Sequence, residues 1–337
     1  MYGSARLLPD ERSSAGFQES HEWSPIIGIP MIWPKPRYTG PERRKSRRWR
    51  PQPLRVLLSL LMIAALGYAV AIVWLMTQET RIVFQAGRTL SAGRPAFPYL
   101  QIDIPRVGGA RQFAWVMRRG DSDDGPWVLY LHGNAATVAS KVNISHYTQL
   151  RALGLNLLAP EYRGFSGLDG VPTEAVLDAD AHAAYDYLRV TRHIAPGRIV
   201  IYGWSLGGAV AVGLAAETEQ AAVILEGAPA SLVDIGQLRY PLFPIRLIMR
   251  NPFDSIRNVG RIRSPMLFLH AADDAVIPIS EGRRLFEAAS GDKTFVEVQG
   301  GHAAASEGDA EHFYGAIRQF LQQHGHLLPP AENGGGH

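Results

Sequence analysis

A run of 21 residues without a charged side chain, Val56 to Met76, places the first limit on how this 337-residue chain can fold. As a helix rising about 1.5 Å per residue, the run can cross the roughly 30 Å hydrocarbon core of a bilayer. We therefore predict a transmembrane helix at residues 56–76. A helix buried in a soluble core and a cleaved signal peptide, for which Ala69-Val70-Ala71 resembles a cleavage site, are the alternatives.

Basic residues are concentrated before this run. Residues 1–55 contain 11 Lys and Arg against 5 Asp and Glu, and seven of the 11 lie in the 15 positions directly before Val56. Arg81, Arg88 and Arg94 follow the run. By the positive-inside rule, the arm at residues 1–55 is expected in the cytoplasm and everything after Met76 on the other side. The arm is rich in proline and is predicted to be largely disordered.

The composition excludes several kinds of chemistry. The chain has no cysteine, so disulfides, cysteine zinc sites, iron–sulfur clusters and thiolate nucleophiles are excluded. The residues after the arm carry 23 Lys and Arg against 26 Asp and Glu, so the folded part is slightly acidic. Nucleic acid is therefore not an expected partner.

After a linker at residues 77–96, short apolar runs alternate with longer helical patterns through an expected domain at residues 97–324. The predicted strands are residues 127–131, 155–160, 198–202, 221–225, 265–270 and 293–298. The predicted helices are residues 136–153, 173–192, 206–218, 280–289 and 309–323. This alternation is typical of an α/β fold with a mostly parallel sheet. Residues 99–104 and 113–118 would add an antiparallel edge, and residues 325–337 are expected to form a disordered tail.

Ser205 follows the predicted strand at residues 198–202, within Gly203-Trp204-Ser205-Leu206-Gly207, and a helix of small residues comes next. Ligands of parallel sheets bind at the carboxyl ends of the strands. A G-x-S-x-G between a strand and a helix makes a tight turn that lifts the serine hydroxyl above the sheet. Taken alone, the pattern fits a structural turn as well as a nucleophile.

A serine nucleophile needs a base and an acid that orients the base. Asp274 follows the predicted strand at residues 265–270, and His302 stands in an expected glycine-flanked loop after the strand at residues 293–298. Both come after Ser205 in the order Ser, Asp, His. Asp273 is the rival for the acid.

The turn His132-Gly133-Asn134 follows another strand and would direct a backbone N–H toward Ser205. Together with the N–H of Leu206 it would form an oxyanion hole. We expect His132 itself to be a structural turn residue. Structural roles are also expected for Glu226 and for the block EYRGFSG that begins at Glu161.

These segments together resemble the α/β-hydrolase superfamily, and the chain is similar to the membrane-anchored serine hydrolases of the Bem46 and ABHD13/ABHD17 type. The matching segments are LHGNAA, EYRGFSGLDG, GWSLGG, NPFDSIRNVGRIRSPMLFLHAADDAVIP and GGH. The resemblance implies Ser205 as nucleophile, Asp274 as acid, His302 as base, and the main-chain amides of Asn134 and Leu206 as oxyanion donors. Ala136 and Ala271 stand where the family usually has glycine.

A short insertion at residues 227–263 is the expected lid. Its centre, LRYPLFPIRLIMRNPF, combines apolar residues with arginines, and these apolar residues either line the mouth of the site or pack on the domain. An exposed apolar lip would suit lipid-like esters.

The sequence therefore predicts a membrane-anchored serine hydrolase that cleaves carboxylic esters or thioesters through an acyl-enzyme, without a metal or cofactor. The expected partners are a small-molecule or lipid-like ester and membrane lipids, with no obligate protein partner. A serine aminopeptidase-like peptidase and a non-catalytic tethered binding module are the alternatives.

Overall fold

The computed structural model describes residues 52–86, 92–105, 111–120, 123–324 and 327–328. Most of the predicted arm (1–55) and tail (325–337) lies outside these ranges. Within the tail, Leu327 and Leu328 are buried against the domain, so the expectation of disorder is wrong for these two residues. The described residues from Leu57 onward belong to one compact unit.

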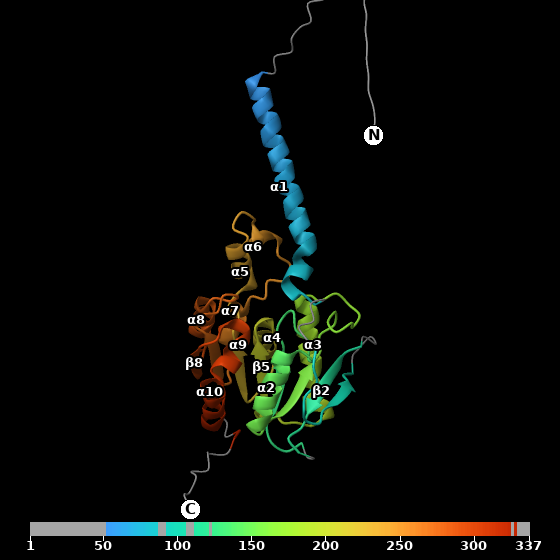
Figure 1. Cartoon of the computed structure of the whole chain (residues 1–337), viewed down its shortest axis with the longest axis vertical. Helices are drawn as coiled ribbons and strands as arrows, with labels where there is room; N and C mark the ends of the chain where they lie inside the picture. Colours follow the sequence, from blue (N-terminus) through green and yellow to red (C-terminus); the bar gives the residue numbers. More distant parts are fainter. Residues whose placement is uncertain (1–51, 87–91, 106–110, 121–122, 325–326, 329–337) are drawn as a thin grey trace, which may run out of the picture. The chain divides into compact units, whose positions relative to one another are not determined.

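An eight-stranded sheet forms the centre of the domain (Figure 1), in the order β1-β2-β4-β3-β5-β6-β7-β8. The strands are β1 (Leu100–Asp103), β2 (Phe113–Met117), β3 (Trp127–Leu131), β4 (Asn156–Pro160), β5 (Ile199–Trp204), β6 (Ala222–Glu226), β7 (Met266–Ala271) and β8 (Lys293–Val298). Strands β3 to β8 are parallel, and β1 and β2 form the antiparallel edge. The predicted sheet is confirmed.

Helices cover both faces of this sheet. The longer ones are α2 (Lys141–Ala152), α3 (Glu174–Asp186), α4 (Leu206–Ala215), α8 (Ile279–Ala288), α9 (Gly301–Gly308) and α10 (Ala310–Gln323). A π-helical turn (Tyr187–Thr191) continues α3, and a 3-10 turn (Pro196–Arg198) precedes β5. Helices α3, α4 and α8 pack on one face, whereas α2, α9 and α10 pack on the other.

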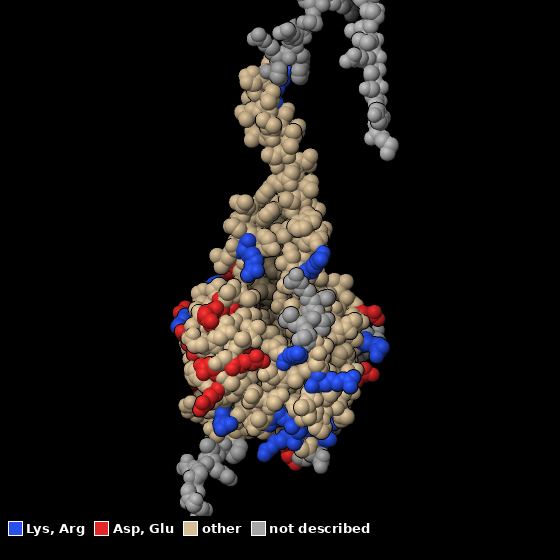
Figure 2. Space-filling model, viewed as in Figure 1, with Lys and Arg blue, Asp and Glu red and all other residues tan. Residues whose placement is uncertain are grey.

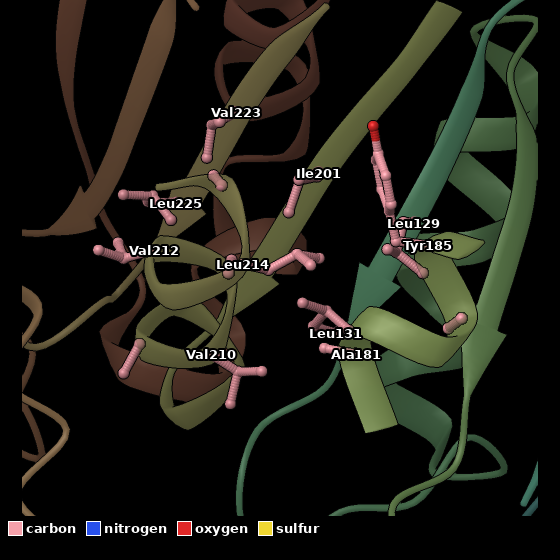
Figure 3. Packing of buried hydrophobic residues seen from close by; sticks show 14 of the residues in the cluster. Leu129, Leu131, Ala181, Tyr185, Ile201, Val210, Val212, Leu214, Val223 and Leu225 are labelled. Atoms are coloured by element: carbon pink, nitrogen blue, oxygen red, sulfur yellow. The ribbon is translucent and has the colours of Figure 1, made fainter. Parts of the chain in front are cut away.

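The alternation of side chains along the strands produces a separate core on each face. In β3, Leu129 and Leu131 pack with α3 and α4, as Figure 3 shows, whereas Val128 and Tyr130 belong to the core beneath α2 and α10. Every residue of β3 is buried. This double burial explains why the central strands are apolar throughout.

Helix α1 (Pro53–Phe84) contains the apolar run. It is long and apolar enough to cross a membrane, and none of its most apolar 18-residue window is buried in the fold. This exposure contradicts the alternative of a buried core helix. The helix also continues to Phe84, so residues 77–84 of the expected linker are helical.

The end of α1 that follows the apolar run is attached to the domain by buried polar and apolar contacts. Glu79 accepts hydrogen bonds from the backbone N–H groups of Arg250 and Asn251, both at 2.8 Å, and from Asn251 Nδ2 at 2.9 Å. Its second oxygen accepts from Arg250 Nε at 3.1 Å. Phe84 is fully buried, with its ring against Phe253. This part of α1 is therefore a component of the folded domain.

The predicted lid contains three short helices, α5 (Leu232–Arg239), α6 (Ile245–Ile248) and α7 (Ser255–Asn258), and a 3-10 turn (Val259–Arg261). Its apolar residues follow both of the expected alternatives. Ile245 is buried, whereas Leu238, Leu242 and Leu247 are exposed.

Candidate active site

The turn between β5 and α4 holds Ser205 in a backbone conformation that few residues adopt. Its φ is 56° and its ψ is −122°, and its N–H donates to the carbonyl of Glu226 at 2.8 Å. A Cβ on Gly207 would lie 2.0 Å from the carbonyl oxygen of Leu131, and one on Gly203 would lie 2.4 Å from the carbonyl oxygen of Gly207. Only glycine fits at these two positions, because α4 approaches the end of β3 at Gly207 and β5 at Gly203 so closely.

Ser205, His302 and Asp274 form one continuous hydrogen-bonded chain. The Nε2 atom of His302 lies 2.7 Å from Ser205 Oγ, and its Nδ1 atom lies 2.6 Å from Asp274 Oδ2. Because a carboxylate can only accept, Nδ1 carries the proton and Nε2 is left to accept the serine hydroxyl. The structure thus brings together three residues that are far apart in the sequence.

Asp274 is held in its ionised form. Its Oδ1 atom accepts the backbone N–H groups of Val276 and Ile277, each at 2.8 Å. Burial alone would raise the pKa of Asp274, but the hydrogen bond from His302 and those from the two N–H groups outweigh burial and hold the pKa below its ordinary value. A carboxylate that stays charged at neutral pH can stabilise an imidazolium beside it.

The rival acid, Asp273, has a different position. Its Oδ1 atom accepts the backbone N–H groups of Gly300 and Gly301, at 3.2 and 2.9 Å. Asp273 therefore fixes the turn that leads into His302, while Asp274 contacts the imidazole.

His302 does not stand in a loop, as the sequence analysis expected. It lies in the first turn of α9, directly after Gly300 and Gly301, both of which have positive φ. The ring of Trp204 stacks near its imidazole, with centroids 6.1 Å apart and planes 30° apart. The glycines and the start of the helix, rather than an irregular loop, orient the histidine.

The backbone N–H groups of Asn134 and Leu206 are free donors near the serine. Among the described residues neither has a hydrogen-bond acceptor, and both residues line one cavity with Ser205. Gly133 brings the turn close, since a Cβ there would lie 3.1 Å from the Cβ of Ser205. Unpaired N–H groups beside a serine hydroxyl can donate hydrogen bonds to an oxyanion and stabilise its negative charge.

The turn that carries Asn134 is held by the end of α1. Asn134 Nδ2 donates to the carbonyl of Val83 at 3.1 Å, and the N–H of Ala135 donates to the carbonyl of Phe84 at 3.2 Å. The position of one free N–H group thus depends on the helix that contains the apolar run.

His132 has the structural role that the sequence analysis expected. It is fully buried, and its Nε2 atom lies 2.9 Å from Glu161 Oε1. Glu161 begins the block EYRGFSG. Arg163 of this block donates to Asp180 of α3 at 2.7 Å. These contacts join the block EYRGFSG to the turn after β3 and to α3, which agrees with the structural role expected of the block.

Glu226 also forms the buried hydrogen bonds expected of it. Its Oε2 atom lies 2.8 Å from His146 Nε2 and accepts the hydroxyl of Tyr202 at 2.5 Å. Burial alone would lower the pKa of His146, but the charge of Glu226 and its hydrogen bond raise the pKa above the ordinary value. This histidine–carboxylate pair is buried and does not line the cavity over Ser205.

A cavity of about 1120 Å³ lies over Ser205. The end of α1 from Trp74 onward, with Gln85 and Ala86 after it, forms one wall, and lid residues form another. The lid residues are Leu232, Ile235, Gly236, Arg239, Tyr240, Ile245, Ile248 and Met249. The position of α1 at the site was not predicted from the sequence, although Glu79, an acidic residue three positions after the apolar run, could have indicated a buried partner.

The described residues contain no group of three or more His, Asp and Glu side chains arranged to hold a metal ion.

Residues 128–278 match the model of the Alpha/beta hydrolase family. The "Uncharacterized protein Rv2307c" of Mycobacterium tuberculosis is 33% identical over 275 residues, which cover 79% of this chain and 95% of that protein. "Lysophosphatidylserine lipase ABHD12" of Danio rerio is 31% identical over 207 residues, which cover 56% of this chain and 53% of that protein.

Solved structures share the fold. The Pyrococcus furiosus esterase Pf2001 has a TM-score of 0.60 and 17% identity, over 69% of this chain and 95% of the esterase. The topology of the sheet, the family match and the relative aligned over nearly its full length agree. The chain belongs to the α/β-hydrolase superfamily.

Proposed function

We propose that this protein is a membrane-anchored serine hydrolase that cleaves carboxylic esters or thioesters through an acyl-enzyme. One observation carries the proposal: the hydrogen-bonded chain Asp274–His302–Ser205 ends in a cavity beside two free backbone N–H groups. Nucleophile, base, orienting acid and oxyanion donors are the parts that acyl transfer by serine requires.

In the first half of the reaction, Ser205 Oγ attacks the carbonyl carbon of the ester while His302 Nε2 takes the hydroxyl proton. The carbonyl oxygen becomes an oxyanion and accepts hydrogen bonds from the N–H groups of Asn134 and Leu206. Asp274 stabilises the imidazolium that results. The tetrahedral intermediate collapses when the bond to the leaving group breaks and His302 returns the proton to the departing alcohol or thiol.

In the second half, His302 removes a proton from water, which attacks the acyl-enzyme. A second tetrahedral intermediate uses the same two N–H groups. Its collapse releases the carboxylic acid and returns the proton to Ser205. Each step uses only residues of this chain and water.

The lining of the cavity supports an acyl group of substantial length. Leu232, Ile235, Ile245 and Ile248 of the lid contribute apolar side chains, and the volume of about 1120 Å³ is that of a large ligand site. The names of two similar proteins, a lipase of lysophosphatidylserine and an esterase, are in keeping with ester substrates.

The apolar run of α1 supports the anchor, and the basic residues before it support the orientation. We propose that the arm lies in the cytoplasm and the hydrolase domain on the opposite side, because seven Lys and Arg residues immediately precede Val56.

Replacing the nucleophile should abolish covalent labelling. Wild-type protein is expected to react with a fluorophosphonate probe, whereas Ser205→Ala should show no labelling because, among the described residues, no other hydroxyl group is hydrogen-bonded to His302. Ser280→Ala is the control, since Ser280 is exposed and lies outside the hydrogen-bonded chain. Equal labelling of Ser205→Ala and the wild type would refute the assignment.

Asparagine substitutions of the two neighbouring aspartates should lower kcat by different amounts. Asp274→Asn is expected to lower kcat by about 10⁴-fold, because an amide favours the wrong tautomer of His302. Asp273→Asn should stay within about tenfold of the wild type, since its amide oxygen can still accept the N–H groups of Gly300 and Gly301. Steady-state rates with a p-nitrophenyl ester measure both, and a reversed order would make Asp273 the acid.

Acyl preference should follow the apolar lining. We expect p-nitrophenyl esters with medium or long acyl chains to be hydrolysed faster than aminoacyl anilides, because the cavity offers apolar contacts. The comparison of kcat/KM for the two substrate series measures this preference. Faster cleavage of the anilides would favour a peptidase instead.

Orientation can be measured with fusions to the C-terminus. A reporter enzyme that is active only outside the cytoplasm should be active when it is fused to the C-terminus of this protein, because the positive charges retain the arm in the cytoplasm. A reporter active only in the cytoplasm serves as the matched fusion and should be silent. Activity of the cytoplasmic reporter alone would reverse the proposed orientation.

A further inference from the structure

The loop between α5 and α6 touches α1 within its apolar run. The hydroxyl of Tyr68 donates to the carbonyl of Leu242 at 2.7 Å. The rings of Tyr68 and Phe243 are stacked, with centroids 5.7 Å apart and planes 13° apart. These contacts tie the loop to one level of the helix.

That level lies inside the apolar run rather than at its end. Tyr68 precedes Met76 by eight residues, so it is about 12 Å farther along the helix from the domain. Whatever surrounds α1 at Tyr68 therefore also surrounds Leu242. If a bilayer encloses the run at residues 56–76, the loop cannot remain wholly in water.

The exposed surface of the lid is rich in apolar side chains, which a position within a bilayer requires. Leu238, Leu242 and Leu247 are 72%, 80% and 85% exposed, and the segment from Tyr240 to Ile245 has no charged residue. In Figure 2 the length of α1 above the domain is tan, and the lid beside it combines tan with a blue patch of Lys or Arg. Large apolar side chains in contact with water are unfavourable, and their clustering marks a surface that is covered.

Two arginines border the uncharged segment 240–245 in the sequence. Arg239 and Arg246 flank this segment and are exposed, and Arg246 pairs with Asp234. Long arginine side chains can extend to lipid headgroups while their stems stay in apolar surroundings. An apolar segment bordered by basic residues is typical of a segment that lies at a membrane interface.

We propose that the lid tip, residues 238–247, inserts into the same leaflet that α1 enters, so that the lipid bilayer covers Leu238, Leu242 and Leu247. This inference rests on the membrane anchor of the proposed function. The shared depth of Tyr68 and Leu242 favours the bilayer over a second copy of the chain or a protein partner as the occupant.

Insertion of the lid tip also determines how a substrate enters the cavity. The cavity over Ser205 is also lined by Trp74, Leu75 and Met76, the last residues of the apolar run, and by Tyr240 of the lid tip. It therefore reaches from the nucleophile to the level at which α1 leaves the bilayer. An amphiphilic ester can pass from the leaflet into the cavity between α1 and the lid without crossing water.

Because the chain has no cysteine, single cysteines can report depth in the full-length protein. An environment-sensitive fluorophore is attached to the cysteine of Leu242→Cys. The labelled protein is reconstituted in phosphatidylcholine–phosphatidylglycerol vesicles, with or without nitroxide groups on the lipid chains as quenchers. Val70→Cys within the apolar run is the positive control. Val190→Cys, at an exposed apolar residue of the domain, is the negative control.

Quenching at residue 242 comparable to that at residue 70, with none at residue 190, is the expected result. Quenching at residue 70 alone would overturn the inference and leave the anchor intact. A probe at residue 242 that is shielded from water but not quenched by nitroxide lipids would overturn it too, in favour of a protein partner. No quenching at residue 70 would refute the anchor and the inference together, whereas fluorophosphonate labelling reports separately on the hydrolase.

A functional readout uses the variant Leu238→Ser/Leu242→Ser/Leu247→Ser. Hydrolysis of a long-chain ester held in these vesicles should fall at least about tenfold, because three large apolar contacts with the bilayer are lost. Hydrolysis of a soluble short-chain ester in detergent should change by less than about twofold, since none of the three side chains lines the cavity. Val190→Ser is the matched control. Equal losses on both substrates, or no loss on the vesicle-borne ester, would overturn the role of the lid tip.

Discussion

The close approach of β5, α4 and the turn after β3 is the constraint on which the rest of this site depends. Gly207 lies so near the carbonyl oxygen of Leu131 that no side chain fits between them, and Ser205 adopts a positive φ at the same point. The free N–H groups of Asn134 and Leu206 come within reach of one hydroxyl because of this approach. Backbone packing, more than any single side chain, thus creates the place where an acyl group could react.

Much of this arrangement could be predicted from the sequence, because strands buried on both faces are apolar throughout and end in short polar turns. Ser205, Asp274 and the turn at Asn134 each follow such a strand, and their order in the sequence agreed with a known superfamily. The rivalry between Asp273 and Asp274 could not be resolved in the same way. Asp273 and Asp274 have the same side chain and follow the same strand, so only their hydrogen-bond partners distinguish them.

The remaining features depend on tertiary contacts that leave little local signal. His302 was expected in a loop because glycines precede it, yet those glycines introduce α9. Residues 77–84 contain polar and charged side chains that look like a linker, but Glu79 finds its partners in the lid and the helix continues. The contact between Tyr68 and Leu242 joins residues 174 apart, so no local pattern could reveal it.

The attachment of Glu79, Val83 and Phe84 changes where the folded domain should be considered to begin. Cutting the chain after Phe84 would remove the acceptor for Asn134 Nδ2, the aromatic ring against Phe253 and the carboxylate that binds the buried N–H of Asn251. Each buried donor left without a partner costs about 1–3 kcal/mol. A version without the apolar run must therefore retain the last turns of α1, because the folded domain and the apolar run share one helix.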